Sequence, residues 1–161
     1  MILLALILGA LPTALNAAPT GATYTARTAE ANGTARWSLD EIFTALRVVE
    51  TGGIKNEGRR AVGDGGKAIG PLQIHRDYWE DSKVPGRFED CRELPYARRV
   101  VLAYWRRYCP KALDTLDAEV LSRVHNGGPK GAQKESTKVF WRKVERELAR
   151  QREKNRRATF V

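Results

Sequence analysis

The stretch SLDEIFTALRVVETGG, residues 38–53, has the features of a complete amphipathic helix. Ser38 and Glu41 are spaced as a capping box, in which each side chain bonds the other residue's backbone amide. Apolar residues then recur at helical spacing, at Ile42, Phe43, Leu46 and Val49. Because Gly52 and Gly53 end the helix, Glu50 is expected in its last turn.

Four further segments outside this helix show helical periodicity, and no run of alternating residues indicates a strand. We expect these helices over 71–82, 95–108, 117–126 and 136–148, the first of them opened by Gly70-Pro71. Residues 54–69 are polar and glycine-rich and predict a loop or a small β-hairpin. The predicted fold class is therefore mainly α, with about five helices in one domain over 36–150.

The chain begins with the apolar run MILLALILGAL, followed by Pro12 and by NAAP at 16–19. This run is too short to span a membrane and is typical of a signal peptide, expected over residues 1–17. An uncleaved anchor or a misplaced start are the alternatives, since the first basic residue is Arg27. Residues 18–35 predict a flexible lead-in. The expected location is secreted or periplasmic, with no stable membrane insertion after cleavage.

Cys91 and Cys109 are the only cysteines. In an exported protein they predict one disulfide, and two buried free thiols are the alternative. Two cysteines do not make a zinc site, which needs four nitrogen or sulfur ligands. We expect neither a metal nor a cofactor.

The 161 residues carry 28 Lys or Arg against 19 Asp or Glu, a net charge of +9. A basic surface favours anionic partners, namely nucleic acid, acidic membranes or cell-wall polymers. Residues 142–157 hold eight of the basic residues and three Glu, or +5. We interpret them as a solvated helix end that frays into a basic C-terminal tail over 151–161, or as an electrostatic tether.

Glu50 and Asp64 form the most informative pair of acidic residues. A carboxyl group partly desolvated at the helix end, beside Val48 and Val49, would hold a proton near neutrality. Asp64 lies in the turn sequence GDGG, which keeps a carboxylate solvated and ionised. One neutral acid and one carboxylate are what glycoside hydrolysis requires, and lysozyme is the established example of this division of roles.

Several segments between about residues 42 and 146 resemble the invertebrate-type (destabilase-like) lysozymes. They are VETG at 49–52 with VGDG at 62–65, IGPLQIHRDYWED at 69–81, RVHNGGPKG at 123–131 and TKVFWRKV at 137–144. The HNGGP piece is the most specific of them. That family is typically cysteine-rich, and this chain is not. The chain therefore resembles a divergent branch, in which disulfides that would hold the loop between the carboxylates are missing.

The resemblance implies a lysozyme-like helical fold and a secreted, antibacterial, monomeric hydrolase. It implies that Glu50 is the general acid and Asp64 the second carboxylate in cleaving the β-1,4 bond between N-acetylmuramic acid and N-acetylglucosamine in peptidoglycan. The residues that it implies for the sugar cleft are Gln73, His75, Tyr78, His125 and Asn126. Peptidoglycan is then the anionic partner, and no nucleic acid is expected.

Three other functions stay open at this stage. A lytic transglycosylase would use Glu50 alone, and Glu50-Thr51 followed by Gly70-Pro71-Leu72-Gln73 also resembles those enzymes. An isopeptidase could use His125 as its base, but no serine stands out as the nucleophile. A non-catalytic basic protein could bind the cell wall through its C-terminal charge. The sequence also leaves the choice between retaining and inverting hydrolysis open.

Overall fold

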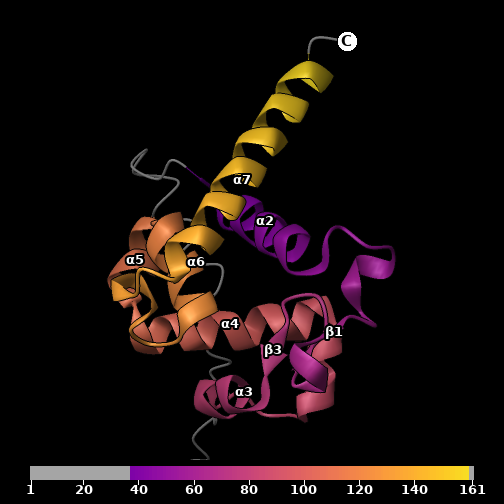
Figure 1. The fold of residues 1–161 in the computed structure, drawn as a ribbon, viewed down its shortest axis with the longest axis vertical. Coiled ribbons are helices and arrows are strands. Elements are labelled where there is room, and N and C mark those ends of the chain that lie inside the picture. Colours follow the sequence, from indigo (N-terminus) through magenta and orange to yellow (C-terminus); the bar gives the residue numbers. More distant parts are fainter. Residues whose placement is uncertain (1–36, 160–161) are drawn as a thin grey trace, which may run out of the picture.

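The computed structural model describes residues 37–159 of the chain (Figure 1). The predicted signal peptide (1–17) and lead-in (18–35) lie outside the described residues. The mainly α fold class is confirmed, with six helices and three two-residue strands in the described part. The helices are α2 (Leu39–Thr51), α3 (Arg76–Ser82), α4 (Leu94–Tyr108), α5 (Pro110–Thr115), α6 (Ala118–Gly127) and α7 (Thr137–Thr159). The strands are β1 (Val62–Gly63), β2 (Ala68–Ile69) and β3 (Ile74–His75).

Helix α2 begins and ends as its sequence predicts. The Glu41 amide donates to the Ser38 hydroxyl at 3.2 Å, and the Ser38 amide donates to the Glu41 carboxylate at 2.8 Å. Gly52 ends the helix in the left-handed conformation with φ 63°, which glycine adopts without steric cost. Glu50 accordingly lies in the last turn, one residue before the helix ends.

The segment predicted as a loop or hairpin contains a hairpin. Strands β1 and β2 pair antiparallel, with Val62 opposite Ile69 and Gly63 opposite Ala68. Strand β3 adds to the other edge of β2, with Ala68 opposite His75. The turn between β1 and β2 is the 3-10 helix η2 (Asp64–Gly66), so the small sheet places Asp64 at its tip and His75 nearby.

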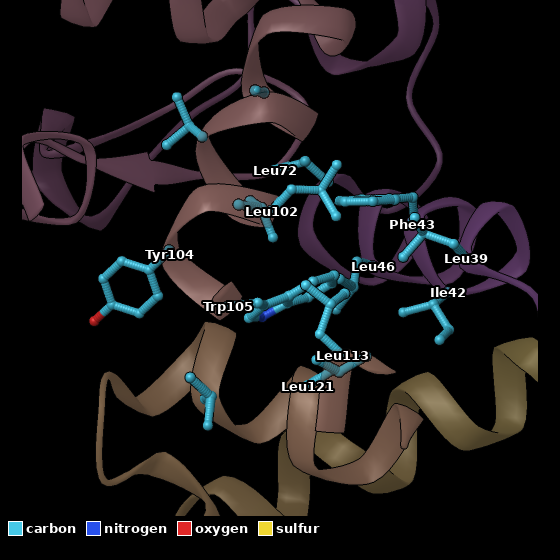
Figure 2. Packing of buried hydrophobic residues seen from close by; sticks show 14 of the residues in the cluster. Leu39, Ile42, Phe43, Leu46, Leu72, Leu102, Tyr104, Trp105, Leu113 and Leu121 are labelled. Atoms are coloured by element: carbon cyan, nitrogen blue, oxygen red, sulfur yellow. The ribbon is translucent and has the colours of Figure 1, made fainter. Parts of the chain in front are cut away.

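The core is built around Trp105 of α4, which is fully buried (Figure 2). Its ring stacks on Phe43 of α2 at a centroid distance of 5.2 Å. Leu113 of α5 and Leu121 of α6 pack on the same cluster. Burial of such side chains contributes about 1.5–3 kcal/mol each, so this cluster sets the position of α2, which carries Glu50.

One predicted helix start is wrong, and one helix was not predicted. The helix expected from Pro71 begins only at Arg76, because residues 70–75 form a turn followed by β3. Gly70 and Gln73 have positive φ values of 74° and 45°, which a helix does not allow. Helix α5 was not expected, because its six residues are too few to show a periodicity.

The predicted disulfide is also wrong, since Cys91 and Cys109 are both free thiols. Cys91 lies in the 3-10 helix η3 (Phe88–Arg92) before α4, and Cys109 follows the last residue of α4. The 15 residues of α4 span about 22 Å, whereas a disulfide needs Cα atoms within about 7 Å. Burial raises the pKa of Cys91 to about 12 and that of Cys109 to about 11, so both stay protonated at neutral pH.

The basic C-terminal segment continues as α7 as far as Thr159, and its far end projects beyond the other helices (Figure 1). Arg152 fixes the helix to α2 by donating to the Glu41 carboxylate at 3.1 Å. The Arg152 guanidinium also lies over the Trp37 ring, 3.9 Å from its centroid. Within residues 37–159, α7 and the other helices are too short or too polar to cross a membrane.

Candidate active site

The seven predicted site residues line one hollow of about 210 Å³. They come from the end of α2, the β1–β2 hairpin, the turn before β3, β3 itself, α3 and the end of α6. The full lining is Glu50, Asp64, Ala68, Gln73, His75, Tyr78, His125 and Asn126. Segments up to 76 residues apart in the sequence therefore contribute to one concave site, and Ala68 is the lining residue that sequence reasoning missed.

Glu50 occupies the enclosed side of this hollow, with its side chain 18% exposed. Its Oε1 lies 3.4 Å from Nε2 of His125, whose side chain is only 4% exposed. Helix α6 carries His125 in its last turn, so the carboxyl group and the imidazole meet where α2 and α6 both end. Glu50 is thus positioned by a buried partner that can either donate or accept a hydrogen bond.

The other ring nitrogen of His125 contacts Tyr78. His125 Nδ1 lies 3.4 Å from the Tyr78 hydroxyl, and the two rings meet edge to face at a centroid distance of 5.6 Å. Tyr78 in turn stacks on Tyr104 at 3.7 Å. Burial raises the pKa of Tyr78 well above its ordinary value, and the nearby Tyr104, Cys109 and Glu50 raise it further. Tyr78 therefore stays a neutral hydroxyl.

This order of contacts defines two proton arrangements for Glu50, His125 and Tyr78. When the imidazole proton is on Nδ1 it donates to the Tyr78 oxygen, and Nε2 can accept from protonated Glu50. When the proton is on Nε2 it donates to ionised Glu50, and Nδ1 accepts from the Tyr78 hydroxyl. Both protonation states of Glu50 are thus satisfied without moving a heavy atom.

Asp64 is held differently on the opposite side of the hollow. Its side chain is 66% exposed, and its nearest charged partner is His75, with Nε2 at 3.6 Å from Oδ2. The backbone of Asp64 has φ 48°, a left-handed conformation that short polar residues such as Asp tolerate. Water therefore solvates this carboxylate, as its turn sequence predicts.

Gln73 and Asn126 form the remaining polar parts of the lining. The Gln73 amide donates to the Gly70 carbonyl at 2.8 Å. A side chain at Gly63 would place its Cβ 2.2 Å from Gln73 Oε1, so the glycine leaves room for this amide. Asn126 is exposed and follows His125 in α6, where its amide faces solvent and the hollow.

The HNGGP segment depends on residues to which the sequence alone assigns no role. Buried Arg123 donates to the Thr137 hydroxyl at 3.1 Å and to the Lys134 carbonyl at 3.1 Å. Thr137 donates in turn to the Gly131 carbonyl at 2.7 Å. A Cβ at Gly131 would lie 1.9 Å from the Arg123 carbonyl oxygen. These contacts hold the loop after α6 in place. Arg123, Gly131 and Thr137 all lie in the segments that resemble the family, at 123–131 and 137–144, and this is the signal in the sequence that could have identified them.

In the part of the chain that the structure describes, no group of three or more His, Cys, Asp and Glu side chains could hold a metal ion. The acid–base groups that the hollow does contain are two carboxyl groups and two imidazoles. Such groups can transfer protons and stabilise charge, and Glu50 lies on the enclosed side of the hollow while Asp64 lies on its exposed side.

The comparison with known proteins identifies the family. The chain is 33% identical over 95 residues to an invertebrate-type lysozyme of Ruditapes philippinarum, a match that covers 58% of this chain and 69% of that protein. The chain belongs to the invertebrate-type lysozyme family. No family model matches it, in keeping with a divergent member.

Two further relatives show how much of the chain resembles the invertebrate-type lysozymes. The lysozyme of Magallana gigas is 38% identical over 79 residues, which cover 48% of this chain and 58% of that protein. The chain thus spans little more than half the length of that relative. The crystal structure of Tapes japonica lysozyme superposes with a TM-score of 0.55 at 27% identity, over 65% of this chain and 85% of that one. The lysozyme-like fold is therefore shared.

Proposed function

We propose that this invertebrate-type lysozyme cleaves the β-1,4 bond between N-acetylmuramic acid and N-acetylglucosamine in peptidoglycan. The observation that carries the proposal is the contrast within one hollow between Glu50, 18% exposed, and Asp64, 66% exposed. Glycoside hydrolysis needs one carboxyl group that delivers a proton and one that stays ionised. Membership of a family whose relatives are named lysozymes supports the same reaction.

Glu50 is the proposed general acid. With the His125 proton on Nδ1, Nε2 accepts a hydrogen bond from protonated Glu50 and orients the carboxyl group toward the hollow. As the glycosidic bond breaks, Glu50 transfers its proton to the leaving oxygen. The resulting carboxylate is then stabilised when His125 presents Nε2–H instead, so His125 supports Glu50 both before and after the transfer.

Asp64 is the proposed second carboxylate. In this proposal the Asp64 carboxylate stabilises the oxocarbenium-like centre or attacks it directly. Carboxyl groups about 5 Å apart in the substrate complex would act by retention, and groups about 6.5–9.5 Å apart by inversion. His75, 3.6 Å from Asp64, orients this carboxylate from the sheet.

The sugar-binding part of the proposal assigns Gln73, Tyr78 and Asn126 to hydroxyl and acetamido groups of the substrate. Amide and hydroxyl groups that line a concave site give such groups their hydrogen-bonding partners. Secretion or export to the periplasm, a monomeric state and peptidoglycan as the anionic partner complete the proposal. The net charge of +9 favours capture of that polyanion.

A lytic transglycosylase is the second candidate, because it would use Glu50 without a second carboxylate. The presence of Asp64 in the same hollow favours hydrolysis over this alternative. The test is digestion of purified peptidoglycan, followed by mass spectrometry of the product ends. Hydrolysis leaves reducing N-acetylmuramic acid, whereas transglycosylation leaves a 1,6-anhydro sugar, and the latter product would overturn the assignment. The E50Q variant controls for contaminating activity.

A further inference from the structure

A second hollow, of about 440 Å³, lies beside the segment that joins Glu50 to the hairpin. It is larger than the hollow of the candidate active site, at about 210 Å³. The 3-10 helix η1 (Asn56–Gly58), the two residues after it and the start of α4 form its walls. We call it the arginine pocket, after three of its lining residues, Arg59, Arg60 and Arg92.

Only some of the charged side chains of the arginine pocket form ion pairs with one another. Arg59 pairs with Glu93 across the pocket. The side chains of Glu57, Arg60 and Arg92 make no hydrogen bond or ion pair with other described residues of the chain. Two guanidiniums and one carboxylate therefore face the same space without a partner. A guanidinium binds a carboxylate through two parallel hydrogen bonds, and Glu57 can accept from an ammonium group.

The turn at residues 70–73 connects a lining residue of the arginine pocket with one of the candidate active site. On one side, the Gly70 carbonyl accepts from the Gln73 amide, which lines the active-site hollow. On the other side, a Cβ at Gly70 would lie 2.9 Å from the Cα of Arg92, which lines the arginine pocket. The Gly70 amide also donates to the Ala61 carbonyl at 2.9 Å, next to Arg60.

We propose that the arginine pocket binds the peptide stem of peptidoglycan while the glycan strand occupies the active-site hollow. This inference rests on the proposed function. A bare glycan strand offers hydroxyl and acetamido groups, with its only carboxylate on the sugar itself. A stem peptide adds a terminal carboxylate and, where its diamino residue is not cross-linked, an ammonium group. The two free guanidiniums and the free carboxylate of the pocket match this pair of opposite charges.

The contacts of the turn at residues 70–73 place the two hollows on neighbouring parts of the structure. An extended peptide covers roughly 3.3–3.6 Å per residue, so a stem of four residues reaches roughly 13–14 Å from the sugar. In this proposal the pocket holds the end of the stem that carries the charges.

The first test compares two substrates with the double variant R60Q/R92Q. On peptidoglycan with intact stems, we expect KM to rise about tenfold with kcat unchanged, because charge-assisted contacts to the peptide are lost. On strands stripped of peptide by an amidase, KM should equal that of the wild type. The control R106Q/K111Q removes two exposed cations that lie outside the basic segment 142–157 and should change neither value. An equal rise on both substrates, or no rise on either, would overturn the proposal.

The second test is independent of catalysis. Calorimetry of a soluble tetrapeptide stem with the E50Q protein should detect binding, and R60Q/R92Q in the same background should weaken it about tenfold. E57Q should weaken binding of the free tetrapeptide, but not of a tetrapeptide whose side-chain amine is acetylated. Absence of binding to E50Q would overturn the stem-peptide inference even where peptidoglycan is cleaved. Binding without cleavage by the wild-type protein would instead overturn the proposed function.

Discussion

The two sides of the hollow at the candidate active site are built on opposite principles. Glu50 lies at the end of a 13-residue helix, is 18% exposed and meets a buried histidine. Asp64 lies in a three-residue 3-10 turn, is 66% exposed and meets a half-exposed histidine. The core around Trp105 holds the first side, while local turn geometry and two short strand pairs hold the second. The proposed acid is thus enclosed, and the proposed second carboxylate is exposed to water.

The largest expected effect comes from removing the enclosed carboxyl group. E50Q keeps the shape of the side chain but cannot donate a proton, so kcat on peptidoglycan should fall by about 10³-fold or more. Release of reducing ends measures this fall. The control E145Q removes an exposed carboxylate on α7 and should keep full activity. Appreciable turnover by E50Q would show that the acid lies elsewhere.

The next effect tests the solvated side. D64N removes the charge that stabilises the developing positive centre, and kcat should fall by about 10²-fold. D114N, at an exposed position in α5, provides the matched control. If D64N retained wild-type activity, a mechanism with Glu50 alone would be favoured. The proposed role of Asp64 as the second carboxylate would then be wrong.

His125 and His75 allow a direct comparison between the Glu50 side and the Asp64 side of the hollow. H125Q removes a partner with a 4% exposed side chain, and H75Q one with a 41% exposed side chain. We expect kcat to fall about tenfold for H125Q and only two- to threefold for H75Q, because buried hydrogen bonds are worth more than exposed ones. The pH profiles of kcat for both variants separate a role in proton transfer from a loss of folding. Equal effects would contradict the distinction.

Gly131 and Gly63 differ in what an added Cβ would meet, which is rigid backbone at Gly131 and a movable side chain at Gly63. G131A would force its Cβ against the Arg123 carbonyl, which cannot move without the helix, and should lower the free energy of unfolding by about 1–3 kcal/mol. G63A meets only the end of the Gln73 side chain, which can turn away. We expect G63A to unfold at the wild-type denaturant concentration but to bind substrate more weakly. Urea titrations and KM values together check both expectations.

The smallest effect concerns the support of α2 by α7. Burial pushes the pKa of Glu41 upward, but hydrogen bonds from Ser38 and Arg152 outweigh this and leave the pKa below the ordinary 4.5. The stability that ionised Glu41 contributes is therefore complete above about pH 4.5 and is lost as the pH falls through its lower folded value. E41Q should unfold at lower urea at pH 6 and show a shallower decline toward pH 3 than the wild type. E145Q should match the wild type.

The features that the sequence predicts depend on contacts between neighbouring residues, and the features that it does not predict depend on contacts between residues far apart in the chain. The predicted features are the capping box of α2, its glycine end and the hairpin of β1 and β2. The late start of α3 at Arg76 depends on Gly70, which packs against the backbone of Cys91 and Arg92 about 20 residues away. The disulfide prediction failed for the same reason, because composition favours pairing while α4 holds the two thiols at opposite ends.

The candidate site divides in the same way. The sequence by itself predicted the seven residues that meet in the hollow, because a helix-end Glu, a turn Asp and the HNGGP motif are local patterns. Only the tertiary structure decided that His125 meets Glu50 and Tyr78 through its two ring nitrogens, that Arg123 and Thr137 hold the loop after α6, and that three arginines line a second hollow. The His125 contacts join residues 47 and 75 positions apart, and no local spacing encodes them.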